Sequence, residues 1–391
     1  MPDQLPDQLP DQMPDQLPDQ MPDQGFAQQP AFPPPEDRPA GRRRPEPRMV
    51  SLAVGLGVTL AAGAVLFSLP VPYLVETPGP TVDTLGSQDG KELIQIDQEP
   101  THQVTGQLRL TTVGAIGSNP GSLDLFNLVE GYFDGDDAVV PYDLIYPRHT
   151  TAEEREAQSA AEMTSSQDAA VAAALEHLGM PVGVEVVEPQ TAAAKAVFAA
   201  GDELTSINGQ PINGFASLKA ILGGIEAGGP VEVGLIRDGR AESVTAETSP
   251  DGEGGALLGV TVTFKSPVKI EFGVEDIGGP SAGSMFALGI IAKLGPSDLA
   301  GGRVIAGTGT VDAEGVIGGI GGIRQKMIGA KRDGAEVFLA PAANCAEVVG
   351  NEPPGLQVVK VASLDDAVDA LDALRAGSQA DLPVCSQADA G

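Results

Sequence analysis

The chain has 391 residues, with 23 lysines and arginines against 54 acidic residues, which gives a net charge of −31. Such an acidic chain repels phosphate backbones, which argues against a nucleic-acid partner. Its three histidines and two cysteines cannot assemble a Cys₄, Cys₂His₂ or HExxH zinc site, so no metal or other cofactor is expected. Any chemistry must come from carboxylates, hydroxyls or lysines. The length suggests about two or three domains.

Residues 1–48 form a polar arm that repeats Pro-Asp-Gln six times over residues 2–24 and contains 13 of the 33 prolines. Proline blocks both helices and sheet ladders, so the arm is expected to be disordered. No charged residue follows from Met49 to Val75. This stretch is long enough to cross a bilayer and predicts one transmembrane helix at 49–71. The alternative is a cleaved signal peptide, whose apolar region is usually shorter and closer to the N-terminus.

Four arginines (Arg42, Arg43, Arg44 and Arg48) precede this helix and predict a cytoplasmic N-terminus. The chain is therefore expected to be a single-pass protein of the cell membrane with residues 72–391 outside the cytoplasm. Beyond Val75 the sequence has 18 basic and 45 acidic residues, and such an acidic domain should not bind anionic lipid. Cys345 and Cys385 would both lie in an oxidising compartment, which favours a disulfide between them over two free thiols.

The first part of the ectodomain, residues 72–181, contains alternating runs such as Gln107–Val113 that predict strands. Two helices are expected after these strands. Thr151-x-x-Glu154 and Ser165-x-x-Asp168 both have the pattern of a capping box, and an apolar stripe from Val171 stops at Gly179.

A compact unit at 182–249 has strand patterns at Val182–Val187, Glu203–Ile207 and Val231–Ile236 around a short helix at Phe215–Leu222. Asn208-Gly209 indicates a tight turn between two apolar segments. The run Gly201-Asp-Glu-Leu-Thr-Ser-Ile-Asn-Gly-Gln-Pro-Ile212 resembles a PDZ domain of the bacterial type. The resemblance implies that an extended peptide binds as an added strand beside the unit's first strand and helix. The alternative is a small β-domain without a ligand. The next residues, 249–255, have the composition of a linker.

Ser281 lies in a glycine-rich segment, Gly279-Pro-Ser-Ala-Gly283, that leads into an apolar helix pattern from Ala282 to about Leu294. The segment matches G-x-S-x-G, the nucleophile elbow of α/β-hydrolases, but that triad needs a histidine after the serine and all three histidines precede it. No phosphate-binding G-x-x-x-x-G-K-[ST] motif is present. The remaining alternatives are a serine that only caps the helix and a nucleophile with a base other than histidine.

A lysine could act as that base if burial lowered its pKa. In a helix over Gly322–Arg332, Lys326 shares the i, i+3, i+4, i+7 stripe with Ile323, Met327 and Ala330 and should face the core. The other polar side chains, including Gln325, are expected elsewhere on this helix. The alternative is a lysine whose ammonium group reaches back to solvent.

These segments together resemble the proteolytic domain of the Lon-type serine peptidases, and the motifs run from about Asp276 to Pro341. Besides the Ser281 turn they include Ala306-Gly-Thr-Gly-Thr-Val311, Ile317-Gly-Gly-Ile-Gly-Gly-Ile-Arg-Gln-Lys326 and Gly334-Ala-Glu-Val-Phe-Leu-Ala-Pro341. One membrane helix, a PDZ-like unit and this domain are similar to the membrane-anchored, PDZ-containing branch of that family, which is bacterial. The family usually has an aspartate three residues before the serine, where this chain has Gly278. Asp276 is a speculative substitute for that carboxylate.

The resemblance implies a catalytic Ser281–Lys326 dyad, a supporting role for Thr308, which would orient the lysine, and a supporting turn of Gly279, Pro280 and Ala282. The expected fold is an α+β ectodomain, with a PDZ-like β-domain at 182–249, a Lon-like domain at 256–376 and a tail at 377–391. Two strands, Glu336–Ala340 and Leu356–Val361, and a helix capped by Ser363-x-x-Asp366 should complete its scaffold.

The predicted function is that of an ATP-independent serine endopeptidase that cleaves flexible extracytoplasmic polypeptides, its expected partners, captured by the PDZ-like unit. One alternative is a non-catalytic PDZ adaptor that binds peptides and has a vestigial dyad. A membrane-tethered esterase is another. Lon-type domains often assemble as rings, so a homo-oligomer is a further partner that the resemblance allows.

Overall fold

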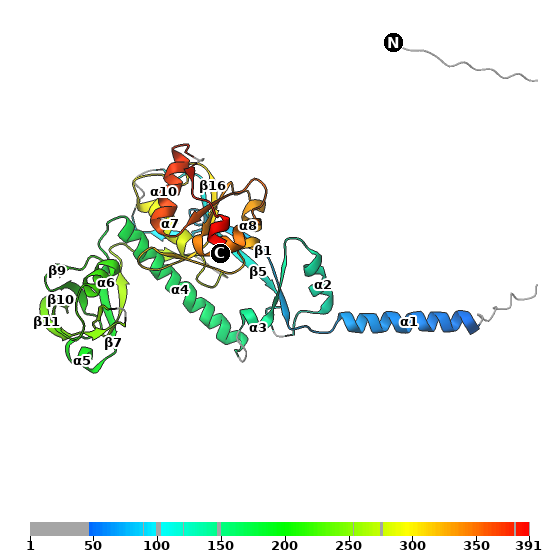
Figure 1. Ribbon diagram of the computed structural model, residues 1–391, viewed down its shortest axis with the longest axis horizontal. Coiled ribbons are helices and arrows are strands. Elements are labelled where there is room, and N and C mark those ends of the chain that lie inside the picture. The colour runs from blue at the N-terminus through cyan, green and yellow to red at the C-terminus, as the bar shows by residue number, and fades with distance from the viewer. Residues whose placement is uncertain are drawn as a thin grey trace, which may run out of the picture. The chain divides into compact units, whose positions relative to one another are not determined.

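The computed structural model of the chain describes residues 47–88, 90–98, 103–119, 121–146, 150–252, 254–273, 277–378 and 381–390 (Figure 1). The Pro-Asp-Gln repeats and Asp276 lie outside the described residues. Helix α1, Pro47–Phe67, has 21 residues and a mean hydropathy of 2.2 over its most apolar window. In the described part of the chain it is the one helix long and apolar enough to cross a membrane. At 1.5 Å per residue it measures about 30 Å, the thickness of a hydrocarbon core.

A six-stranded mixed sheet is the framework of the larger α/β part. Its strand order is β20-β19-β16-β5-β1-β6. The strands are β1 Tyr73–Asp83, β5 Gln107–Ile116, β6 Ala138–Pro141, β16 Val304–Gly307, β19 Val337–Pro341 and β20 Gln357–Val361. β16 pairs in parallel with both β5 and β19, while β1 is antiparallel to β5 and β6. The sheet therefore joins strands from residues 72–181 to strands of the expected proteolytic segment.

Helices cover both faces of this sheet. They are α4 Ala152–His177, α7 Gly283–Leu294, α8 Ile323–Arg332 and α10 Leu364–Arg375. Alternate strand residues point to opposite faces. Val337 and Leu339 pack in the core cluster of α4, α7 and α10, whereas Phe338 packs with α8. The result is a helix–sheet–helix sandwich, in which α7 and α8 lie on opposite faces.

Helix α4 corrects the prediction of two helices in its region. It begins at a capping box of Thr151 and Glu154, as predicted. Ser165 and Asp168, the second predicted capping box, lie inside the same continuous helix. An alanine-rich sequence with no glycine or proline gives the helix no reason to stop there. The neighbouring Ser166 is buried and its Oγ donates to the carbonyl oxygen of Pro280 at 3.0 Å.

The PDZ-like unit is built on a second sheet. The path β11-β10-β8-β7-β14 is extended by β9, which pairs with β8. The elements are β7 Gly183–Pro189, α5 Ala192–Val197, β8 Glu203–Ile207, β9 Gln210–Pro211, α6 Phe215–Gly223, β10 Pro230–Arg237, β11 Arg240–Glu247 and β14 Val260–Lys265. Asn208 and Gly209 both have positive φ, 49° and 78°, as the tight turn between β8 and β9 requires.

The segment expected to be a linker contains a small hairpin instead. Ser249–Pro250 (β12) pairs with Ala256–Leu257 (β13), and the chain then returns to the PDZ-like sheet as β14. β14 is an edge strand, and β7 lies between β14 and β8. The first strand of the unit, β7, therefore has no free edge on which to add a peptide, contrary to the sequence-based expectation. The composition of residues 249–255 could not reveal the hairpin because a two-residue pairing leaves no apolar pattern.

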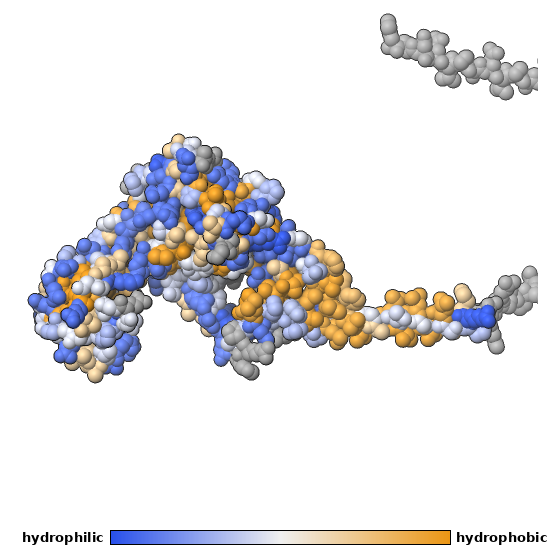
Figure 2. All heavy atoms as spheres, in the orientation of Figure 1, coloured by the Kyte–Doolittle hydropathy of each residue, from blue (hydrophilic) through white to orange (hydrophobic). Residues whose placement is uncertain are grey.

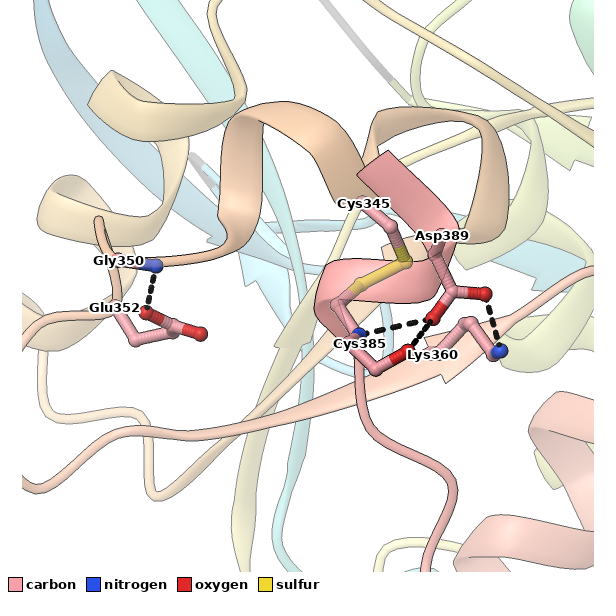
Figure 3. Close-up of a disulfide and its surroundings, with 7 residues drawn as sticks. Cys345, Gly350, Glu352, Lys360, Cys385 and Asp389 are labelled. Atoms are coloured by element: carbon pink, nitrogen blue, oxygen red, sulfur yellow. Dashed lines mark hydrogen bonds and ion pairs between the residues drawn. A yellow bond between two sulfur atoms is a disulfide. The ribbon is translucent and has the colours of Figure 1, made fainter. Parts of the chain in front are cut away.

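The remaining elements are short. They are β2 Ser87–Gln88, β3 Lys91–Glu92, β4 Ile94–Ile96, α2 Leu125–Phe133, α3 Tyr142–Ile145, β15 Ile270–Phe272, β17 Thr310–Val311, β18 Ile317–Gly318, η1 Ala342–Asn344, α9 Cys345–Val348 and η3 Gln387–Ala390. A disulfide joins Cys345 to Cys385 and ties the C-terminal tail to α9 (Figure 3). Lys360 of β20 also pairs with Asp389 of the tail at 2.9 Å.

Candidate active site

Ser281 lies in the turn that precedes α7. Gly279 has a φ of +83°, which a side chain would strain, and the chain then passes through Pro280 to the serine. The residue at the helix N-cap is Ala282, which has no side-chain hydrogen bond to the helix. The interpretation of Ser281 as a helix cap is therefore wrong. The residue is partly buried, and its side chain has another partner.

Lys326 reaches Ser281 from the opposite face of the sheet. The side chain is only 3% exposed, and its Nζ lies 2.9 Å from Oγ of Ser281. Ile323, Met327 and Ala330 are buried beside it on α8, as the apolar stripe predicts. Gln325 departs from the prediction because it is 2% exposed. Its Nε2 donates to the carbonyl oxygen of Asp136 at 3.3 Å, in a segment whose proximity the helical period cannot reveal.

Thr308 contacts both Ser281 and Lys326 and fixes the direction of its hydrogen bonds to them. Its hydroxyl group donates to the carbonyl oxygen of Ser281 at 3.0 Å, and Nζ of Lys326 donates to Thr308 Oγ1 at 3.0 Å. A hydroxyl group has one proton, so Thr308 can only accept from the lysine. A neutral Lys326 that donates one N–H to Thr308 can direct its lone pair toward Ser281.

Burial lowers the pKa of Lys326 from its ordinary value of 10.5 to about 8. The negative charge of Glu76 acts in the opposite direction and raises the pKa of this lysine. Glu76 comes from β1, and its own pKa is raised by burial. Sequence reasoning did not identify Glu76. The one available signal was a carboxylate inside an apolar strand pattern, Leu74-Val-Glu76.

Gly278 has a physical explanation in the packing of α4. A Cβ atom at this position would lie 2.1 Å from Oγ and 3.2 Å from Cβ of Ser159, so the aspartate of the family pattern would need the Ser159 side chain to move. The amide of Gly279 also donates to the carbonyl oxygen of Ser159 at 3.1 Å. Ser159 of α4 thus occupies part of the space that a side chain at residue 278 would need.

The serine and the lysine both line a cleft of about 610 Å³. Its walls are mainly apolar and come from β1, β5, α3 and the segment before Ser281. They include Pro80, Val82, Val113, Ile145 and Ile277, with Glu76 as the acidic group. Among the described residues, no group of three or more histidine, cysteine or acidic side chains could hold a metal ion.

The PDZ-like unit offers a separate candidate for peptide binding at the free edge of β14. Phe264 of this strand meets Phe215 of α6 edge to face, with ring centroids 5.9 Å apart. Val260 and Val262 are only partly buried against the core of the unit. Gly259, just before the strand, has a φ of +69°. A half-covered apolar strand next to a helix has the features that strand addition needs.

Comparisons with known protein families give one match for the segment that contains Ser281 and Lys326 and one for the PDZ-like unit. Residues 266–372 match the Lon protease (S16) C-terminal proteolytic domain, and residues 161–248 match the PDZ domain. The chain therefore contains a segment of the Lon-type proteolytic class and, before it, a PDZ domain. The two matches are consistent with a Lon-type, PDZ-containing protease family, which confirms the resemblance drawn from the motifs.

Individual relatives match only parts of the chain. It is 45% identical over 64 residues to the periplasmic serine endoprotease DegP of Escherichia coli K12, which covers 16% of this chain and 14% of that protein. It is 29% identical over 142 residues to the Lon protease of Azospirillum brasilense, with 34% and 17% covered. The chain thus spans about a seventh of the length of the DegP relatives.

Solved PDZ domains are also similar. The PDZ domain of the SdrC-like protein from Listeria monocytogenes is 22% identical, covers 20% of this chain and 86% of its own, and has a TM-score of 0.20.

Proposed function

We propose that this chain is a membrane-anchored, ATP-independent endopeptidase that hydrolyses flexible extracytoplasmic polypeptides with Ser281 as nucleophile and Lys326 as general base. The observation that carries the proposal is a buried lysine whose Nζ lies 2.9 Å from the serine hydroxyl, both lining one cleft. A pKa of about 8 leaves part of the lysine neutral near neutral pH.

In the proposed mechanism, Lys326 takes the hydroxyl proton of Ser281 as Oγ attacks the peptide carbonyl carbon. The oxyanion is stabilised by backbone N–H groups at the start of α7, and removal of one such donor costs about 3–4 kcal/mol in other serine proteases. The lysine then gives its proton to the leaving amine, and an acyl-enzyme remains. Lys326 next activates water, which releases the acyl group. Thr308 orients the amine throughout, and Gly279, Pro280 and Ala282 hold the nucleophile in position.

Substrate choice is assigned to the PDZ unit. An extended segment, free at its C-terminus, would add as a strand to the edge of β14 beside α6. The sequence contains no phosphate-binding loop, so ATP-driven unfolding is not part of the proposed mechanism. Flexible or already unfolded segments are the expected substrates.

The proposed topology rests on α1 and the charges before it. The helix has the length and hydropathy of a membrane span, and Arg42, Arg43 and Arg44 precede it while Arg48 lies in its first turn, so its N-terminal side should stay in the cytoplasm. The disulfide between Cys345 and Cys385 supports an oxidising compartment for the rest of the chain.

The direct test uses the full-length protein in detergent micelles with an unstructured casein. We expect cleavage without ATP and covalent labelling of Ser281 by a serine-directed phosphonate, both lost in S281A. If the alternative of a non-catalytic PDZ adaptor holds, peptides bind but neither labelling nor cleavage occurs. If the esterase alternative holds, simple esters are hydrolysed while casein stays intact.

The pH profile provides a second test. Only the neutral amine of Lys326 can accept a proton, so kcat/KM should rise about tenfold per pH unit below pH 8 and level off above it. Replacing Glu76 by glutamine removes the charge that raises the pKa of Lys326, and the midpoint should move to lower pH. The exposed Glu336, paired with Arg303, gives the matched control E336Q, which should leave the midpoint in place. A rate independent of pH from 6 to 10 would contradict the role of Lys326.

A further inference from the structure

Large apolar side chains gather on the outer surface of the segment that contains α2 and α3 (Figure 2). We call these residues the aromatic patch, with their exposed fractions: Phe126 59%, Tyr132 72%, Phe133 80% and Leu144 72%. Helix α2 buries only Gly131, which packs against Val75 of β1. The helix therefore turns its glycine inward and its aromatic side chains outward, the reverse of an ordinary core helix.

The aromatic patch begins next to the end of α1. The amide of Leu125 donates to the carbonyl oxygen of Leu69 at 3.2 Å, and the amide of Val71 donates to Leu123 at 2.9 Å. Leu69 follows the last residue of α1, Phe67, by two positions, and two residues span at most about 7 Å. If α1 crosses the bilayer, the start of α2 must lie at the bilayer surface.

The charges around the aromatic patch decide between lipid and protein as its occupant. Acidic residues adjoin it in the sequence: Glu130 on α2, and Asp134, Asp136 and Asp137 in the loop that follows. In a symmetric contact with a second copy these acids would face the same acids. Uncharged lipid carries no such penalty, and tyrosine and phenylalanine suit the membrane interface. The acids predict weaker contact with anionic lipid.

The same segment contacts the candidate active site. Side chains of Arg324 and Gln325, which precede Lys326 on α8, donate to the carbonyl oxygens of Gly135 and Asp136. Ile145 at the end of α3 lines the cleft. A surface that rests on the bilayer would therefore hold the cleft close to it.

We propose that the aromatic patch inserts into the uncharged lipid surface of the outer leaflet, so that the cleft takes polypeptide segments held close to the bilayer. This inference rests on the proposed membrane anchor and adds a substrate class to the proposed protease.

The absence of tryptophan from the sequence permits a direct test. Three full-length variants with a single tryptophan, F133W in the patch, L60W in α1 and V384W in the exposed tail, are reconstituted in phosphatidylcholine vesicles with or without brominated acyl chains. We expect the bromine to quench F133W and L60W by about half or more and to leave V384W unchanged. Adding phosphatidylglycerol should reduce quenching of F133W only.

The outcomes separate the two proposals. Quenching of L60W without F133W overturns the lipid contact and leaves the anchor in place. Loss of quenching at both overturns both. A blue-shifted but unquenched F133W identifies a second copy as the occupant, which also overturns the inference.

Proteolysis tests the substrate class. A flexible peptide is offered either free or tethered to the vesicle by a lipid. The double variant F133S/Y132S should cleave the tethered peptide at least about fivefold more slowly than the wild type and the free peptide at an unchanged rate. Equal losses on both peptides would indicate a damaged fold and contradict the proposal.

Discussion

Replacing Ser281 by alanine should lower kcat/KM for unstructured casein by about 10⁴-fold or more, and replacing Lys326 by methionine should do the same. The alanine removes the attacking oxygen. The methionine keeps the length of the buried side chain but has no amine to accept the proton, although Nζ lies 2.9 Å from Oγ in the wild type. The measurement is the initial rate of cleavage by the full-length protein in detergent micelles.

Because the two groups act in one proton transfer, their effects should not add. The double variant S281A/K326M should be no less active than either single variant, within the background of the assay. The matched control is K331A on the same helix, since Lys331 is exposed and its Nζ donates to Gly355 at 2.8 Å. Its rate should stay within about twofold of the wild type. Cleavage by K326M at the wild-type rate would rule out lysine as the base.

The stability of K326M provides an independent readout. The folded-state pKa of Lys326, about 8, lies below its ordinary value of 10.5. A lysine shifted in this direction destabilises the fold below the folded-state pKa, and this cost disappears as the pH rises past 10.5. The K326M variant should therefore be more stable than the wild type at pH 7, but not at pH 11.

Loss of the disulfide should have the largest effect on stability. Replacing Cys385 by serine opens a loop of 40 residues, and the chain-entropy relation gives a loss of about 4 kcal/mol in the free energy of unfolding. Cys345 is completely buried, so changing the tail cysteine disturbs the packing least. Urea unfolding at pH 7 followed by circular dichroism measures the difference.

Reductant supplies the control for this variant. Dithiothreitol should destabilise the wild type to the level of C385S and leave C385S itself unchanged, because the serine variant has no bridge to break. A wild type whose unfolding midpoint does not respond to complete reduction would contradict the assigned role of the disulfide.

The sequence patterns singled out Ser281 and Lys326 as candidate site residues. The glycine-rich turn before an apolar helix indicated that the serine could be a nucleophile. The 3.6-residue period of the helix over Gly322–Arg332 predicted that the lysine faces the core. Neither pattern carries distance information, so the contact itself came from the family resemblance. The two capping boxes at Thr151 and Ser363 are also present in the structure as predicted.

What the sequence could not predict depends on contacts between distant segments. Glu76 approaches Lys326 because β1 and α8 pack together across 250 residues of chain. A side chain at Gly278 would meet Ser159 of α4, which lies 119 residues earlier in the chain. β14 joins the PDZ-like sheet from beyond the expected domain boundary. Local periodicity cannot predict these three contacts, because each joins segments that are far apart in the sequence.

The C-terminal tail also covers part of the edge of the six-stranded sheet. β20 is the outermost strand, and its Lys360 amide donates to the carbonyl oxygen of Pro383 at 2.8 Å. An open edge strand is a template for pairing with another chain. Held there by the bridge to Cys345, the tail takes up hydrogen-bonding capacity that would otherwise recruit a second molecule. Reduction should thus favour aggregation through this edge, besides lowering the free energy of unfolding.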